Sequence, residues 1–208
     1  PATGTAGTPV PDTLTFGRFG EVRLLHPAGE ARDVVLFFSG EHGWDAQAAR
    51  VAASLAAEHA WVAGIDTRHF LAQMEKSADK CIALPVETEN LSHYVQARAG
   101  VVHYLQPTLA GEATGAALAY ATLVAAPANL FKGALSLGFC PSLQTRKPLC
   151  KGQGPGVERR GAGELQLLPA ANLGGRWIVL PRSAGSADPP AIAAAPGAGA
   201  ASFLNACG

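Results

Sequence analysis

The sequence is poor in charge and contains no strongly basic run. Charged residues make up 15% of its 208 residues and apolar residues 48%, and sixteen basic side chains balance sixteen acidic ones. The longest basic run is Arg159-Arg160, which argues against a nucleic-acid partner and against an anionic membrane surface. No window approaches the roughly 20 apolar residues that span a bilayer, so we expect no transmembrane segment. A chain of this length and apolarity predicts one domain around a substantial core.

The four cysteines lack the Cys-x-x-Cys spacing that zinc sites use, so we expect no metal and no cofactor. Cys140 and Cys150 flank a polar loop, which favours a disulfide in an oxidising compartment. Four cysteines allow three pairings, of which we favour Cys140 with Cys150 and Cys81 with Cys207. The alternative is four buried thiols in a reducing cytosol.

Apolar runs and helical patterns alternate along most of the chain. Residues 1–13 form a predicted tail or linker, and residues 14–208 a single domain that opens with a hairpin. Buried strands are predicted at 33–40, 61–66, 107–110, 133–139 and 177–180, and helices at 46–59, 87–100 and 116–126. Residues 141–163 form a predicted surface excursion, and 182–201 a weakly ordered Ala/Gly/Pro segment. The alternation predicts an α/β/α sandwich with a mostly parallel sheet, truncated or degenerate at its C-terminal end.

The centre of the chain carries a motif typical of a hydrolase active site. Gly111-Glu112-Ala113-Thr114-Gly115 lies between a predicted strand and a predicted helix, where α/β-hydrolases have the nucleophile elbow Gly-x-Ser-x-Gly. Ala113 occupies the serine position, and a methyl group cannot attack a carbonyl carbon. An ordinary glycine-bearing strand-to-helix turn is the alternative interpretation.

The catalytic histidine expected of such a site is also missing. The triad of an α/β-hydrolase follows the order nucleophile, acid, histidine, so the histidine lies after the elbow. All six histidines of this chain precede the elbow, at positions 26, 42, 59, 69, 93 and 103. Asp188 is a candidate for a vestigial acid, although a solvated loop residue is the more ordinary interpretation. We therefore name no catalytic residue.

The carboxyl ends of the parallel strands are nevertheless predicted to converge at one edge of the sheet, where α/β proteins bind ligands. Ser39-Gly40-Glu41-His42-Gly43-Trp44 corresponds to the loop that supplies part of an oxyanion hole. The candidate cleft residues are Ser39, Gly40, Glu41, His42, Trp44, Asp66, Glu112 and Thr114. For Trp44 the main expectation is packing, with ligand stacking as the alternative.

Several of these segments together resemble a known family. The residues concerned are Phe38-Ser39-Gly40, Gly43-Trp44, Gly64-Ile65-Asp66, Asn90 to Tyr94, the elbow with Ala119-Tyr120-Ala121, and Leu135 to Pro141. They are similar to the VirJ/AcvB family of bacterial virulence proteins, over about residues 14–182. The likeness is strongest to the amino-terminal hydrolase-like domain of the longer members. It implies a periplasmic location, and a neighbouring catalytic domain associated with hydrolysis of aminoacyl-phosphatidylglycerol lipids.

The sequence supports three functions. The first is a non-catalytic binding or accessory domain for a lipid or protein ligand, or for a second, catalytic domain of a parent chain. The second is a serine esterase or lipid hydrolase whose nucleophile has been substituted at Ala113 and whose histidine lies outside this chain. The third is a structural spacer. The start, Pro1-Ala2-Thr3, has no initiator Met and no signal pattern, so we expect a trimmed terminus.

Overall fold

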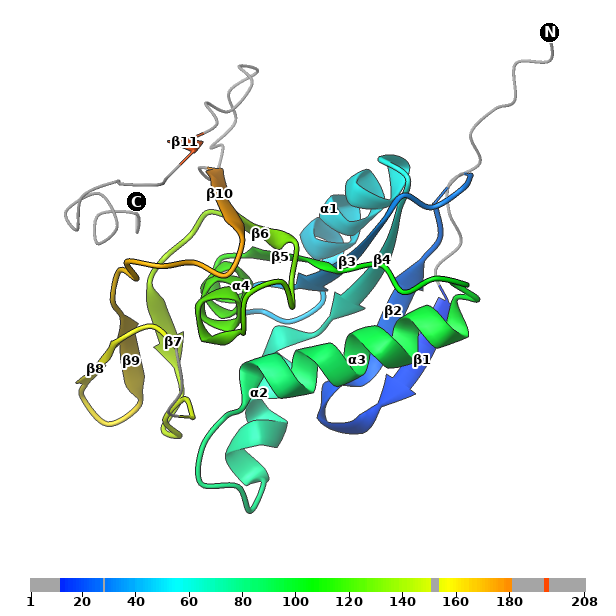
Figure 1. Ribbon diagram of the computed structural model, residues 1–208. Helices are drawn as coiled ribbons and strands as arrows, with labels where there is room; N and C mark the ends of the chain where they lie inside the picture. The colour runs from blue at the N-terminus through cyan, green and yellow to red at the C-terminus, as the bar shows by residue number, and fades with distance from the viewer. Residues whose placement is uncertain (1–11, 28, 151–153, 181–192, 195–208) are drawn as a thin grey trace, which may run out of the picture.

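A computed structural model of the chain describes residues 12–27, 29–150, 154–180 and 193–194. Its main sheet has eight strands in the order β1-β2-β4-β3-β5-β6-β10-β11. The five strands from β4 to β10 run parallel to one another, and β1, β2 and β11 pair antiparallel at the two edges. The predicted three-layer α/β class with a mostly parallel central sheet is confirmed (Figure 1).

The strands of this sheet follow the predicted order along the chain. They are β1 (Asp12–Phe16), β2 (Gly20–Leu25), β3 (Asp33–Phe38), β4 (Ala60–Ile65), β5 (Thr108–Glu112), β6 (Gly133–Leu137), β10 (Arg176–Leu180) and β11 (Ala193–Ala194). A single 3₁₀ turn, η1 (Gly17–Phe19), joins β1 to β2. The predicted tail, residues 1–13, extends two residues too far, because Asp12 and Thr13 already pair with β2. Residues 1–11, and the predicted weakly ordered segment 182–201 apart from β11, lie outside the described residues.

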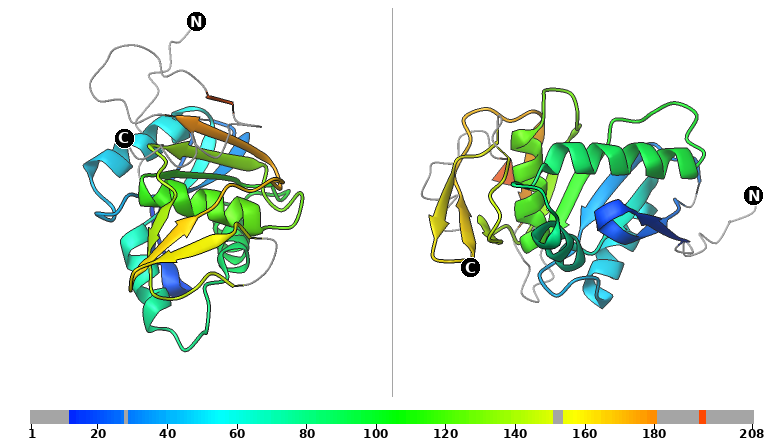
Figure 2. Two further views of the ribbon diagram at one scale, coloured as in Figure 1. Left: turned by 90° about the vertical axis from the view of Figure 1, so that its left-hand side faces the viewer. Right: turned by 90° about the horizontal axis from the view of Figure 1, so that it is seen from below.

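The helices cover the two faces of the sheet unequally. They are α1 (Ala46–Ala57), α2 (Thr67–Lys76), α3 (Leu84–Arg98) and α4 (Thr114–Ala125). The apolar side of α1 packs on one face with residues of β3 and β4, while α2, α3 and α4 contribute to a larger core on the other face. Figure 2 shows α3 and α4 together on their side of the sheet and α1 on the opposite side. None of the described helices is long and apolar enough to cross a membrane.

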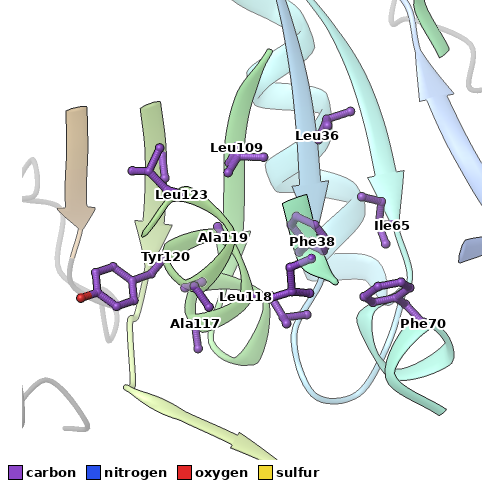
Figure 3. Close-up of a cluster of buried hydrophobic side chains, with 14 of the residues drawn as sticks. Leu36, Phe38, Ile65, Phe70, Leu109, Ala117, Leu118, Ala119, Tyr120 and Leu123 are labelled. Atoms are coloured by element: carbon purple, nitrogen blue, oxygen red, sulfur yellow. The ribbon is translucent and has the colours of Figure 1, made fainter. Parts of the chain in front are cut away.

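Helix α4 is the centre of the larger core. Ten consecutive residues from Gly115 to Val124 are buried, so the helix has no solvent-facing side along this stretch. Small alanines let α4 approach the sheet closely, and larger residues such as Leu118 and Tyr120 fill the space around it (Figure 3). An all-round apolar helix of this kind is stable only when it is covered on every side. The main sheet covers one side of α4, and a second sheet helps to cover the rest.

The second sheet forms partly from the predicted surface excursion, residues 141–163, and partly from the residues that follow it. Its three antiparallel strands are β7 (Ser142–Gln144), β8 (Val157–Arg160) and β9 (Glu164–Leu167), in the order β7-β9-β8. Alternate side chains on β7 and β9, namely Leu143, Leu165 and Leu167, are buried in the same core as α4. Within the predicted excursion, Leu143 of β7 is buried, whereas all four residues of β8 are exposed. Strand β9 follows the excursion, and its pattern Glu-Leu-Gln-Leu is that of a half-buried strand, which the sequence analysis did not assign.

A disulfide ties this second sheet to the α2–α3 connection. Cys81 is bonded to Cys150, with a Cα–Cα distance of 4.8 Å. This corrects both favoured pairings, because Cys150 does not pair with Cys140 and Cys81 does not pair with Cys207. Cys140 is also disulfide-bonded, and Cys207 lies outside the described residues. Proximity in sequence gave the wrong partner because the fold brings two remote loops together.

Polar contacts reinforce the same junction, which we call the staple and define as residues 75–82 together with 145–150. One carboxylate oxygen of Glu75 accepts hydrogen bonds from the Thr145 hydroxyl and from the backbone amides of Arg146 and Lys147. The Lys147 ammonium group donates to the Met74 carbonyl, at 2.6 Å, and to both oxygens of Ser77. A cation at these carbonyls is well placed, since the C-terminal end of a helix is negative.

Helix α2 was missed by the sequence analysis, which described residues 67–83 only as mixed. Its buried side includes Phe70, Leu71 and Met74, at helical spacing, and Phe19 of the hairpin stacks on Phe70 with ring centroids 4.5 Å apart. The polar residues between them face outward and obscured the pattern. The helix begins directly after Asp66, which places its N-terminus at the candidate site.

Candidate functional site

The elbow is present in the backbone at the junction of β5 and α4. Ala113 has φ 48° and ψ −114°, a backbone conformation that residues other than glycine rarely adopt. Strained positions of this kind cost on the order of 1–3 kcal/mol and persist only where the surrounding structure fixes them. The hydrolase-type elbow, and not an ordinary strand-to-helix turn, is therefore the local structure at this point.

The two elbow glycines explain how the strain is maintained. A Cβ atom on Gly111 would lie 2.2 Å from the Gly115 carbonyl oxygen, and one on Gly115 would lie 2.2 Å from that of Phe38. Strand β5, helix α4 and the end of β3 thus approach so closely that no side chain fits between them. The Ala113 amide donates to the Leu137 carbonyl at 2.9 Å, which fixes the elbow to β6 as well.

The loop after β3 reaches the elbow, as predicted. A Cβ atom placed on Gly40 would lie 3.9 Å from the Ala113 methyl group and 3.7 Å from Oε1 of Glu112. The amides of Glu41 and Thr114 donate no hydrogen bond to any group in the described part of the chain. In α/β-hydrolases the oxyanion hole consists of the amide after the nucleophile and one from this loop. Thr114 is the residue after the nucleophile position here, and Glu41 belongs to the loop in question.

Ser39 and Asp66 support this loop and have their polar atoms engaged. The buried Ser39 hydroxyl accepts a hydrogen bond from the Thr67 amide at 3.1 Å. The Asp66 carboxylate caps α2 through the His69 amide at 2.8 Å and also accepts from the Trp44 amide at 3.3 Å. These predicted cleft residues therefore connect the ends of β3 and β4, and their contacts are with the chain itself.

Trp44 is a packing residue. Its ring lies against Gly64, where a Cβ atom would come within 2.1 Å of it, and edge-on to Phe37 at a centroid distance of 6.1 Å. The Arg23 guanidinium lies over the ring, 5.0 Å from its centroid. Since its contacts come from the chain's own side chains, the expectation of packing holds and ligand stacking gains no support.

The six histidines do not supply a base to the elbow. His42 is the one in the loop after β3, but its side chain is 80% exposed and its nearest carboxylate is that of Glu41 at 3.7 Å. The others lie elsewhere: His26 on Trp61, His59 near Gly29, His69 at Gly20, His93 on Tyr104, and His103 exposed after α3. Asp188, the candidate acid, is outside the described residues. No group of three or more His, Cys, Asp and Glu side chains suited to a metal ion occurs in the part that the structure describes.

Glu112 is the most unusual polar residue of the site. It is only 6% exposed, and its Oε2 accepts a hydrogen bond from the Gln47 side-chain amide on α1 at 3.0 Å. Sequence reasoning placed Glu112 beside the elbow but predicted neither its burial nor this hydrogen bond, whose donor lies 65 positions away in the sequence. Thr114, the first residue of α4, is partly exposed beside it.

Fold and elbow together place the chain in a known structural class. The strand order, the parallel centre and the strained strand-to-helix turn define an α/β-hydrolase fold. No known protein-family profile matches the chain, and no curated protein matches it in sequence. The similarity to particular proteins therefore comes from the comparison with solved structures.

Three solved structures illustrate that likeness. The Francisella virulence factor BioJ matches with a TM-score of 0.50 at 10% identity, over 68% of this chain and 48% of that one. A thermostable carboxyl esterase from Bacillus coagulans gives 0.47 at 17% identity, over 65% and 45%. A dienelactone hydrolase from Anabaena variabilis gives 0.45 at 14% identity, over 63% and 64%. The chain thus spans about half the length of the Francisella protein, and the likeness concerns the fold.

Proposed function

We propose that this chain is a non-catalytic α/β-hydrolase-like domain that binds a ligand or a partner at the carboxyl edge of its sheet. The observation that carries the proposal is Ala113, which keeps the strained backbone of a nucleophile but presents a methyl group. Strain of this kind marks sites whose geometry matters for function. Retention of the geometry without the reactive group favours binding over chemistry.

The described residues offer no substitute for the missing groups. A serine nucleophile needs an adjacent base, and His42 projects into solvent instead of toward the elbow. Thr114 bears a hydroxyl, but it follows the nucleophile position as the first residue of α4, and no histidine of the described residues forms a hydrogen bond with it. Acyl transfer through either residue is not supported.

An ester hydrolase with a substituted nucleophile is the second candidate. It is favoured by the unengaged amides of Glu41 and Thr114, which correspond to oxyanion-hole donors and would stabilise a developing negative charge. On this account a base would come from residues outside this chain. The resemblance to VirJ/AcvB proteins fits either candidate, as an accessory module beside a catalytic domain or as a disabled hydrolase.

We further propose export to an oxidising compartment, such as the periplasm. The Cys81–Cys150 bond and the disulfide-bonded state of Cys140 support this location, since disulfides persist where thiols are not kept reduced. A lipid-modifying envelope system is the setting that the family resemblance suggests. The second, catalytic domain of such a system is the proposed partner.

The test is an esterase assay of the purified chain with short aryl esters. We expect no turnover above that of a buffer control. Turnover that survives repurification and is abolished by Thr114→Ala or His42→Ala would contradict a non-catalytic role and favour the second candidate. The same assay repeated on a longer parent chain separates a missing base from a missing function.

A further inference from the structure

The carboxyl group of Glu112 lacks a charge partner. Its exposed fraction is 6%, and no Lys, Arg or His of the described residues forms an ion pair with it. The Gln47 amide occupies Oε2, at 3.0 Å, while Oε1 accepts no hydrogen bond from the described part of the chain. Among the described residues, Thr67 Oγ1 is the side-chain polar atom that is both fully buried and without a hydrogen-bond partner. Since Oε1 of Glu112 also has no partner, it must keep some exposed surface.

A carboxylate in this position is short of favourable interactions. Ionised Glu offers about four acceptor sites, and one neutral amide satisfies one of them. Charged groups removed from water are normally paired with an opposite charge or with several hydrogen-bond donors. Oxygen Oε1 itself stays without a donor from the chain.

The space between Oε1 and Gly40 admits at least one carbon-sized atom. A Cβ atom placed on Gly40 would lie 3.7 Å from Oε1 and 3.9 Å from the Ala113 methyl group, which are ordinary van der Waals distances. We propose that Glu112 is the anionic side of a binding site for a primary ammonium group of a small ligand, located between Gly40 and the elbow. This inference rests on the proposed binding function of the same edge of the sheet.

The geometry favours a primary ammonium over other cations. A guanidinium binds best to two free carboxylate oxygens, and Gln47 already occupies one of them. Quaternary ammonium ions need open aromatic faces, whereas Trp44 is covered by Phe37, Gly64 and Arg23. Divalent metal ions need several oxygen or nitrogen ligands, and no such group exists among the described residues.

The experiment is a titration of the isotopically labelled chain with n-butylammonium chloride near neutral pH, followed by backbone amide chemical shifts. We expect saturable shifts centred on Gly40, Gly111 and Thr114. The uncharged isostere n-butanol should not reproduce them. The comparison of these two probes needs no variant, so it tests the proposal even if a substitution at position 112 prevents folding.

Two variants identify the responsible charge. Glu112→Gln should weaken n-butylammonium binding at least about tenfold, since it removes the charge and keeps the shape. Glu58→Gln, an exposed carboxylate beyond the end of α1, changes the net charge equally and should leave binding unchanged.

Three results would overturn the proposal: no saturable shift with n-butylammonium, equal shifts with n-butanol, or equal weakening by Glu112→Gln and Glu58→Gln. None of them would restore catalysis, so the non-catalytic role stands or falls separately on the esterase assay. Conversely, esterase turnover together with charge-dependent binding would refute the non-catalytic role and keep the ammonium site.

Discussion

The staple and the elbow are built on opposite principles. In the staple, Glu75, Lys147 and the Cys81–Cys150 bond hold two remote loops with many satisfied contacts. At the elbow, by contrast, Ala113 is strained, two amides are unengaged and Glu112 has one hydrogen bond. Stability is thus concentrated away from the carboxyl edge of the sheet, while the edge keeps unsatisfied groups. That division is typical of proteins whose binding sites carry strain at a cost in stability.

The disulfide of the staple should give the largest effect. Because Cys81 and Cys150 are 69 residues apart, the bond strongly restricts the unfolded chain. Replacing both with alanine should lower the free energy of unfolding by about 4 kcal/mol in the chain-entropy model. Denaturant unfolding of the double variant measures this loss. A loss below about 1 kcal/mol would mean that the polar contacts alone maintain the junction.

The elbow should respond almost as strongly to a side chain at Gly115. A Cβ atom there would lie 2.2 Å from the Phe38 carbonyl oxygen and 2.4 Å from that of Ser39, both on the backbone. Gly115→Ala should lower the free energy of unfolding by about 3 kcal/mol, because the helix and strand must move apart. Gly163→Ala is the matched control, because a Cβ atom there would meet only the Arg146 side chain, at 3.9 Å.

Glu75 tests the polar half of the staple through pH. The hydrogen bond from the Thr145 hydroxyl, with those from the Lys147 and Arg146 amides, holds the pKa of Glu75 below its usual value despite an opposing effect of burial. The folded state therefore favours the ionised form. Its contribution is complete above the ordinary glutamate pKa and is lost as the pH falls through the lowered folded value.

Glu75→Gln should accordingly lower the free energy of unfolding by about 2 kcal/mol at neutral pH and by much less in acid. Urea unfolding of the wild type and the variant at several pH values measures the difference. A difference that does not change with pH would show that the ionised carboxylate is not what the three donors stabilise.

A smaller effect, of opposite sign, is expected at the strained residue itself. Ala113→Gly should raise the free energy of unfolding by about 1 kcal/mol, since glycine adopts positive φ without a steric penalty. Such a gain would confirm that the elbow is strained with alanine in place. Lower stability of this variant, measured in the same unfolding assay as Gly115→Ala, would argue that Ala113 is not strained in solution.

The sequence predicted the fold better than the contacts within it. Buried strands such as β3 and the capped helix α1 follow from local patterns, and Asp45 caps α1 as expected. The elbow could also be predicted from the sequence, because its glycines are four residues apart and flank the nucleophile position. Local patterns of this kind survive in any tertiary context that uses them.

What could not be predicted depends on segments that meet only in the folded chain. The Cys81–Cys150 pairing reflects the α2–α3 loop meeting the second sheet, and neither cysteine carries a local signal for the other. The hydrogen bond from Gln47 to Glu112 likewise joins residues 65 positions apart. Strand β9 had a readable signal in Leu165 and Leu167, but the residues directly after the predicted excursion were assigned to no element.

The central claim is that the elbow keeps its geometry without catalytic power, and Ala113→Ser tests it most directly. The variant places a hydroxyl at the nucleophile position, next in the chain to Thr114, whose amide is unengaged. A fluorophosphonate probe and an aryl-ester assay would be applied to this variant, with the wild type as the unlabelled control.

We expect slow covalent labelling of the introduced serine and no measurable ester turnover. The reason is that general-base assistance, worth about 10²–10⁴-fold, is absent. Ester turnover by Ala113→Ser that is lost in the double variant with His42→Ala would contradict the account, because a base would then reach the elbow.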